Sequence, residues 1–200
     1  MTNADLNRYY HEEYGMKKIS TFFLLIFAFL FIYKATCYSA EISSSSATPT
    51  EVNYFLAYPG ILPDNPFYFI KAMRDKTVSL LINDNVKRAK FNLLTSDKRM
   101  FAGQLLIEKD KTELGLVTIS KSNNYFHHSI AALQRARLQG TDTREVYIEM
   151  STSIQKHIEL MKKYERYFKK EEKDLYRTEL KRMQEMEKSV YKELDQVNTK

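Results

Sequence analysis

Three histidines in the second half of the chain are the first candidates for chemistry, because imidazole is a common metal ligand. His127 and His128 are adjacent, and His157 lies further along. Adjacent residues of a helix point about 100° apart, so the first two cannot both face one ion. A di-iron bundle places Glu three residues before its ligand histidines, and no Glu stands there. We therefore predict no metal and no cofactor; His128 and His157 are the pair to test for a metal site.

Motifs for catalysis are the second possibility. The sequence contains no P-loop, no G-x-G-x-x-G, no G-x-S-x-G and no H-E-x-x-H. A small helical bundle seldom encloses a cavity in which a nucleophile, its base and an orienting group converge. We predict no catalytic residues and no enzymatic activity. The rival class is a hydrolase, which would need a deep polar cleft and a titratable group with a strongly shifted pKa.

Polar residues also interrupt the apolar pattern of one predicted helix. Lys90, Asp97 and Gln104 are spaced seven residues apart and so share one side of a helix. A partly buried ion pair at such positions sets the register between helices rather than catalysing a reaction. We assign this structural role to Asp97 and the nearby Arg99.

The elements that would position these residues are helices. Apolar residues recur at intervals of three and four after residue 66, as in the seam of an antiparallel bundle. The pattern predicts helices over residues 67–82, 86–109 and 113–138, and a fourth that begins after Thr141 or Asp142. Gly140 suits the left-handed position beyond a helix end. The fold class is therefore all-α, an antiparallel bundle of four to five helices within residues 53–170.

The last segment repeats the apolar pattern with a shift. Its stripe contains Tyr176, Leu180, Met183, Val190 and Leu194. The stripe is offset by one residue across 169–174, which predicts a break or a bend. We expect residues 171–200 to form a C-terminal helix extension that projects beyond the bundle. Docking on the bundle, coiled-coil self-association and a face for a partner's groove are the alternatives.

The first forty residues predict an export signal. Lys17 and Lys18 precede an uncharged run over residues 19–33, and small residues come after it, as in a secretory signal peptide. As a helix the run spans about 22 Å against about 30 Å of bilayer hydrocarbon, although extension to Ala40 would cross it. Residues 1–40 are thus a cleaved signal peptide or a retained anchor helix. In both cases the two lysines mark the cytoplasmic side, and the chain after Ala40 lies outside.

Smaller features surround this signal. Residues 1–15 mix acidic and basic side chains, unlike a signal, so translation is predicted to start at Met16; a short cytoplasmic tail is the rival.

Cys37 is the only cysteine, which excludes an internal disulfide. Lipid attachment to it is disfavoured because Lys34 stands where a lipobox has Leu. Residues 41–52 are rich in Ser and Thr and are predicted to be a flexible tether.

Prolines gather just before the first predicted helix. Pro59 and Pro63 hold the residues before them extended. Asn65 then suits the N-cap, Pro66 the first helical position, and Asp64 the positive end of the helix dipole. We predict a stiff entry ramp that fixes where the first helix begins; a docking motif for a partner is the alternative. The residues that the ramp would lay against the bundle are Tyr54, Phe55, Leu56 and Tyr58.

This ramp resembles the entry motif of the bacterial domain of unknown function 5667 family, Leu-Pro-Asp-Ser-Pro-x-Tyr-x-x-Lys. The matching residues are Leu62, Pro63, Asp64, Pro66, Tyr68 and Lys71, with Asn65 in place of Ser. Residues 97–100 and 156–161 resemble later steps of the family pattern. The resemblance covers residues 58–161, is weak at residues 122–125 and offers no counterpart for the last forty. It implies an exported helical bundle without known activity or catalytic residues.

Charge argues against nucleic acid as the partner. The chain has a net charge of +6, but residues 159–200, its most charged region, hold 12 basic and 10 acidic residues, so no basic face is indicated. We expect an extracytoplasmic protein, secreted or anchored to the cytoplasmic membrane by its N-terminal segment. It would act as a non-catalytic binding module that meets a protein partner or a second copy through helix faces. The alternative is a small envelope stress or metal-responsive sensor.

Overall fold

The computed structural model describes residues 52–198 of the chain. The regular elements in this range are α2 (Tyr68–Leu81), α3 (Asn85–Glu108), α4 (Thr112–Leu138), α5 (Arg144–Tyr164), the 3-10 helix η1 (Glu165–Tyr167) and α6 (Lys170–Asn198). The prediction of an all-α fold is confirmed for this part of the chain. The predicted signal or anchor, and the tether apart from Val52, lie outside the described residues.

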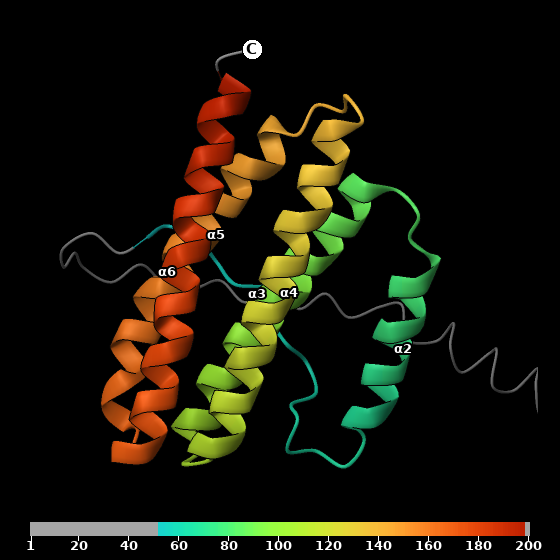
Figure 1. Ribbon diagram of the computed structural model, residues 1–200. Coiled ribbons are helices and arrows are strands. Elements are labelled where there is room, and N and C mark those ends of the chain that lie inside the picture. Colours follow the sequence, from blue (N-terminus) through green and yellow to red (C-terminus); the bar gives the residue numbers. More distant parts are fainter. Residues whose placement is uncertain (1–51, 199–200) are drawn as a thin grey trace, which may run out of the picture. The chain divides into compact units, whose positions relative to one another are not determined.

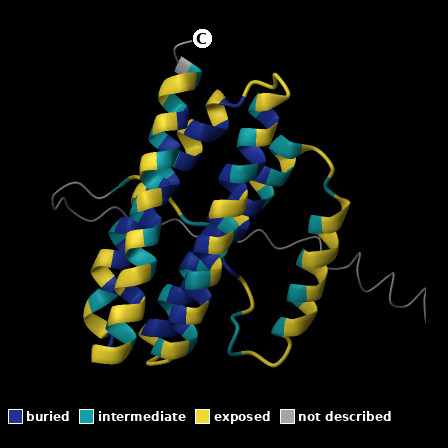
Figure 2. Cartoon of the chain, in the orientation of Figure 1, coloured by how far each residue is buried: buried dark blue, intermediate teal, exposed yellow. Residues whose placement is uncertain are grey.

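Helices α3 to α6 form a four-helix bundle (Figure 1). α3 packs along α4 and α5 packs along α6, while further contacts join α3 to α5 and α4 to α6. Each of these helices turns a buried side toward the centre (Figure 2). Large side chains that are fully buried there include Leu93, Met100, Phe126, Tyr147, Ile154 and Tyr176. The apolar seam that repeats by three and four in the sequence is therefore the core.

Small residues let α3 and α4 approach each other closely. They recur every seven residues as Ala89, Ser96 and Gly103 on α3 and as Gly115, Ser122 and Ser129 on α4. Ser129 Oγ donates a hydrogen bond of 2.7 Å to the carbonyl oxygen of Ala89. A Cβ atom on Gly103 would lie 3.1 Å from the carbonyl oxygen of Gly115. The backbones are thus nearly in contact, and a larger side chain at these positions would separate the helices.

Local sequence signals mark the ends of α3, α4 and α5, and the sequence predicted the one at Gly140. Asp84 precedes α3 and its side chain accepts a hydrogen bond of 2.7 Å from the Lys87 amide, which satisfies one free donor of the first turn. Gly140 has a φ of +80° one residue beyond the C-cap of α4, which confirms its predicted place after the helix end. Before α5, Asp142 Oδ1 accepts from the Arg144 amide at 3.0 Å.

The C-terminal helix differs from its predicted arrangement. The chain breaks earlier than expected, at η1, and α6 then folds back along α5 and α4 instead of projecting beyond the bundle. Tyr176 stacks on Phe168 with ring centroids 4.3 Å apart, and its hydroxyl donates to the carbonyl oxygen of Met161 at 2.8 Å. Met183 and Val190 are fully buried as well. Residues 171–200 are therefore part of the bundle up to the last described turn, because their apolar stripe completes its core.

α2 stands apart from this core. It lies beside α3 in Figure 1 and contains no buried residue. None of the helices in the described range is long and apolar enough to cross a membrane.

Candidate binding site

The ramp ends in a tight turn that leads into α2. The Asn65 side chain accepts a hydrogen bond of 2.9 Å from the Phe67 amide, and its carbonyl oxygen accepts one of 3.0 Å from the Tyr68 amide. The sequence placed Asn65 at the N-cap and Pro66 at the first helical position, but α2 begins two residues later, at Tyr68, so Asn65 closes this turn and Pro66 lies within it. The two bonds occupy amides that the start of a helix leaves free.

Polar contacts tie this motif to the rest of the protein. Asp64 forms an ion pair of 2.8 Å with Lys111, in the loop between α3 and α4, and this bond lowers the pKa of Asp64. Lys71 Nζ reaches back to the carbonyl oxygens of Pro59 and Ile61. Arg99 of α3 donates to the Tyr68 hydroxyl at 3.1 Å. The structure therefore joins Asp64, Tyr68 and Lys71 to three different segments, while Pro63 and Pro66 shape the chain between them.

These contacts give α2 an unusual orientation. Its polar residues Tyr68, Lys71, Asp75 and Ser79 are half-buried on the side toward α3. Its large apolar residues Phe69, Ile70, Met73, Leu80 and Leu81 are between 55% and 76% exposed. These five residues lie within about 120° of the helix circumference, and we call them the outer stripe. A surface helix normally buries such a stripe, so α2 presents a face without a partner in the described part of the chain.

The segment before the ramp crosses the bundle where α3 and α5 meet. The Tyr54 hydroxyl donates to Asp97 at 2.6 Å, and the Val52 amide donates to Glu159 at 2.9 Å. Tyr58 meets Phe101 edge to face at 6.2 Å. Phe55, which the sequence placed against the bundle, is 83% exposed. Leu56 packs on the core. Three of the four residues that the sequence placed against the bundle therefore contact it, namely Tyr54, Leu56 and Tyr58.

Asp97 is the centre of a buried polar cluster. Its Oδ1 atom accepts hydrogen bonds from Ser153 Oγ at 2.7 Å and from His157 Nε2 at 2.8 Å. A carboxylate can only accept, so Nε2 carries the proton in this pair. Burial alone would raise the pKa of Asp97, but the hydrogen bond and charge of His157, with the bonds from Tyr54 and Ser153, outweigh it and lower the pKa. Burial and the Asp97 charge raise the pKa of Tyr54.

The geometry of this cluster differs from that of a catalytic triad. In a triad the hydroxyl bonds to the imidazole, which bonds in turn to the carboxylate. Here Ser153 and His157 both bond to Asp97, and both side chains are fully buried. The arrangement joins α3, α5 and the N-terminal segment by one carboxylate. The sequence predicted a partly buried ion pair that involves Asp97 and Arg99; in the structure Asp97 pairs with His157, and Arg99 bonds to Tyr68.

The two metal candidates lie in different surroundings. His157 is buried in the core, where the ring of Phe126 packs edge-on against it at 5.5 Å. His128 is exposed on α4 beside His127. Among the described residues no three His, Cys, Asp or Glu side chains are grouped so that they could hold a metal ion. The structure thus does not bring His128 and His157 together at one site.

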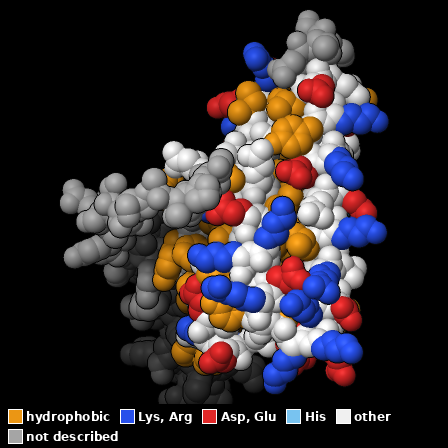
Figure 3. All heavy atoms as spheres, turned by 90° about the vertical axis from the view of Figure 1, so that its left-hand side faces the viewer, with side chains coloured by type: hydrophobic (Ala, Val, Ile, Leu, Met, Phe, Trp, Pro, Cys, Tyr) orange, Lys and Arg blue, Asp and Glu red, His pale blue; other side chains and the backbone are white. Residues whose placement is uncertain are grey.

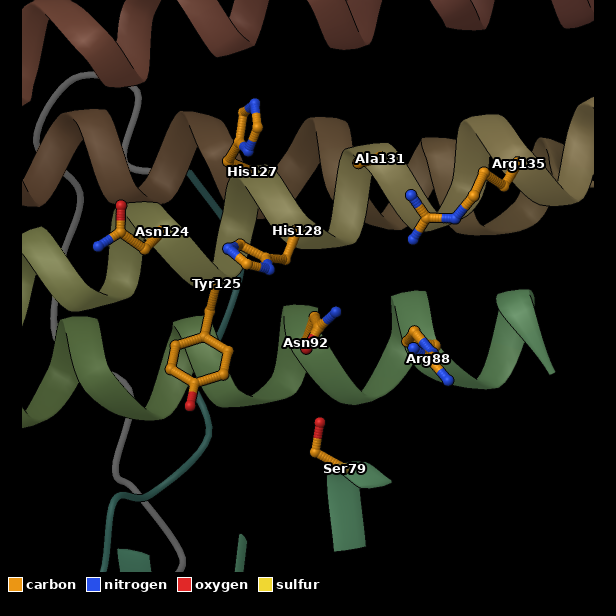
Figure 4. A pocket seen from close by; sticks show the side chains of 9 residues that line it. All are labelled: Ser79, Arg88, Asn92, Asn124, Tyr125, His127, His128, Ala131 and Arg135. Carbon is orange, nitrogen blue, oxygen red and sulfur yellow. The ribbon is translucent and has the colours of Figure 1, made fainter. Parts of the chain in front are cut away.

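A hollow of about 570 Å³ opens between the end of α2 and the pair α3–α4 (Figure 4). It is lined by Ser79 of α2, by Arg88 and Asn92 of α3, and by Asn124, Tyr125, His127, His128, Ala131 and Arg135 of α4. No Asp or Glu is among these residues. Arg88 donates to the carbonyl oxygen of Ile82, and its Nε atom is buried without a hydrogen-bond partner in the described part of the chain.

The distribution of charge explains why the sequence did not reveal this hollow. Over the face seen in Figure 3, which includes α6, acidic and basic side chains are interspersed, as the near balance of residues 159–200 predicted. Residues 68–108, in contrast, which run from the start of α2 to the end of α3, contain eight Lys and Arg residues and four acidic residues, of which Asp97 is buried. This part of the chain therefore has an excess of basic residues, and a count over it would have indicated that excess.

The fold and these sites define a class of protein: an antiparallel four-helix bundle with a Pro-rich ramp and an added amphipathic helix. The family can be stated as well. The model of the family described as Domain of unknown function (DUF5667) matches residues 60–200, and the chain belongs to this family. The match extends through α6, which the resemblance seen in the sequence left without a counterpart.

Comparison with curated proteins and with solved structures gave no significant match. The family description assigns no activity. Two of the segments that resemble the family pattern, residues 97–100 and 156–161, nevertheless meet in the structure, because Asp97 and His157 form the buried pair. Tyr68, the first residue of α2, bonds to Arg99, two residues beyond Asp97.

Proposed function

We propose that this protein is a non-catalytic binding module that works outside the cytoplasm, held at the membrane by its N-terminal segment, and that α2 is the helix that makes contact. The observation that carries the proposal is the exposed outer stripe of α2. Each such side chain gains about 1.5–3 kcal/mol when it is fully removed from water, so five in one face form a strong binding surface even after the costs of association.

The partner that best fits this stripe is the surface of a bilayer. Arg74 and Lys76 border the stripe on its two sides, and a helix with an apolar face flanked by basic residues lies in the interface of anionic lipids. The excess of Lys and Arg over α2 and α3 adds to this attraction. A retained anchor at residues 19–33 would hold α2 close to the membrane, since a short linker raises the effective concentration of the second contact.

A polarity-sensitive fluorophore tests this contact in the full chain. Cys37→Ser removes the native thiol, and Met73→Cys then places one label in the outer stripe, where the side chain is 66% exposed. Leu175→Cys, at a 63% exposed position of α6, is the matched control. After reconstitution into phosphatidylglycerol vesicles, the label at residue 73 should shift to shorter wavelength and resist quenching by aqueous iodide, whereas the label at residue 175 should do neither.

Three other results would point elsewhere. Equal quenching at both positions in the vesicles would refute α2 as the contact. Protection of the label at residue 73 without vesicles, increasing with protein concentration, would assign the stripe to a second copy. Protection that appears in cells and is lost in purified vesicles would assign it to a protein partner. Each of these outcomes rejects the bilayer as the partner, and the last two keep the binding module.

A further inference from the structure

The hollow between α2, α3 and α4 carries positive charge on two of its walls. Arg88 comes from α3 and Arg135 from α4, and Figure 4 shows both side chains at the same end of the hollow. His127 and His128 lie among the lining residues as well. Since no carboxylate is among the lining residues, nothing in the lining neutralises this charge.

Arg88 is held ready for an acceptor. One terminal nitrogen donates to the carbonyl oxygen of Ile82, which fixes the guanidinium group, and the buried Nε has no partner in the described residues. Arg88 lines the hollow, and because its guanidinium group is already fixed, it would lose little freedom on binding an anion there.

Arg135 is available for the same ligand. No hydrogen bond or ion pair with another described residue engages its side chain, although Arg137, two residues on, pairs with Glu193 at 2.8 Å. Neutral hydrogen-bonding groups complete the site. The Ser79 hydroxyl points from α2 toward Asn92 (Figure 4). The α2 side of the hollow thus offers a hydroxyl, and the α3–α4 side offers two guanidinium groups.

We infer that this hollow binds a small phosphate-bearing anion between Arg88 and Arg135. Guanidinium groups match phosphate oxygens with paired hydrogen bonds, and two of them on neighbouring helices suit a tetrahedral group with several charged oxygens better than a single planar carboxylate. The volume, about 570 Å³, is in the range of small-molecule sites. The same phosphate chemistry occurs in soluble phosphate esters and in the headgroups of lipids, and the two sources need separate tests.

Thermal unfolding of the full chain in detergent tests the soluble source. Glycerol 1-phosphate and inorganic phosphate should raise the midpoint temperature beyond the effect of chloride at equal ionic strength, because a ligand that binds the folded state stabilises it. Arg135→Gln should weaken the affinity about tenfold, which corresponds to the loss of one charge-assisted hydrogen bond. Lys90→Gln, at an exposed position of α3 outside the hollow, removes the same charge and should change the affinity less than about twofold.

The lipid source is tested with vesicles. Binding to phosphatidylglycerol vesicles that glycerol 1-phosphate cannot compete away, but that Arg135→Gln weakens and Lys90→Gln does not, would assign the site to a headgroup. Arg88→Gln serves as a second variant once its helicity matches that of the unchanged protein. Equal weakening by Arg135→Gln and Lys90→Gln in both assays would overturn the site, as would no effect of phosphate beyond that of chloride together with unchanged vesicle binding by Arg135→Gln. The unfolding assay with soluble phosphate contains no bilayer and so does not depend on the outer stripe, and the two proposals can fail separately.

Discussion

Ser96 and Ser122 exchange hydrogen bonds between α3 and α4. Ser96 Oγ donates to the carbonyl oxygen of Ser122 at 2.9 Å, and Ser122 Oγ donates to that of Ser96 at 2.8 Å. Both residues are fully buried, and larger side chains would not fit between the backbones. The pair sits midway along the seven-residue repeat of small residues that also contains Gly103 and Gly115. This repeat fixes the register of the two helices.

The first prediction concerns that close approach. Gly103→Ala places a Cβ atom 2.5 Å from Cγ1 of Ile119 and 3.1 Å from the carbonyl oxygen of Gly115. The better helix propensity of Ala, worth about 1 kcal/mol, is then outweighed by overpacking, and we expect a net loss of about 1–2 kcal/mol. Urea unfolding followed by circular dichroism measures it. Adding Ile119→Ala should make the combined loss smaller than the sum of the two single losses; an additive result would contradict the contact.

The sequence predicted the fold class and most helix boundaries because large apolar residues repeat clearly at intervals of three and four. The orientation of α2 could not be predicted in this way. Its stripe has the same spacing as a buried one, and only the polar contacts of Tyr68 and Lys71 turn it outward. The predicted break before α6, across residues 169–174, was placed too late in the chain. The structure breaks at η1, and Phe168 and Tyr176 stack on each other across this break. The hollow depends on Arg88 and Arg135, which are distant in sequence and share no motif.

The second prediction is a loss of stability in acid that depends on Asp97. Its pKa is lower in the folded protein than its ordinary value of about 3.9. The contribution of the Asp97 carboxylate to the free energy of unfolding is therefore fully present above about pH 4 and is lost as the pH falls through the lowered pKa. Asp97→Asn should reduce the free energy of unfolding by about 3 kcal/mol at pH 7 and make it depend less on pH below 4. Asp174→Asn, at an exposed position of α6, should change neither; the same acid dependence in both variants would contradict the role of Asp97.

The third prediction separates the two metal candidates. His157→Ala removes a partner of Asp97 and opens a space in the core, so we expect a loss of about 2–4 kcal/mol in the free energy of unfolding. His128→Ala, at an exposed position, should change it by less than about 0.5 kcal/mol. Unfolding in urea with and without added Zn²⁺ measures both effects. Stabilisation by Zn²⁺ that either substitution abolishes would show that the two histidines do share a metal.

The fourth prediction follows from the position of α6. Removal of residues 171–200 would uncover the apolar side of α4 and α5 that Tyr176, Met183 and Val190 cover. We expect the shortened protein to lose cooperative unfolding and to bind hydrophobic dyes, as partly folded states do. Tyr176→Phe keeps the ring and removes only the hydrogen bond to Met161, so it should cost about 1 kcal/mol. A shortened protein that unfolds as cooperatively as the full chain would show that α6 is dispensable.

The last prediction concerns what holds α2 in place. No residue of α2 is buried, so its position depends on the ramp, where Lys71 bonds to the carbonyl oxygens of Pro59 and Ile61. Burial lowers the pKa of Lys71, which is the direction expected for an amine enclosed by the ramp. Lys71→Met keeps most of the apolar stem and removes the donors. We expect amide hydrogen exchange in α2 to become about tenfold faster, because local opening then costs about 1.4 kcal/mol less.

The rest of the molecule should be unaffected by this change. Exchange in α3 to α6 and the global free energy of unfolding should stay within about 0.5 kcal/mol of the unchanged protein, since Lys71 is outside the bundle core. Lys76→Met is the matched control, because it removes the same charge from the exposed side of α2. If both variants exchange equally fast, charge alone sets the stability of α2. If neither differs from the unchanged protein, the Tyr68–Arg99 and Asp64–Lys111 contacts hold the helix without Lys71.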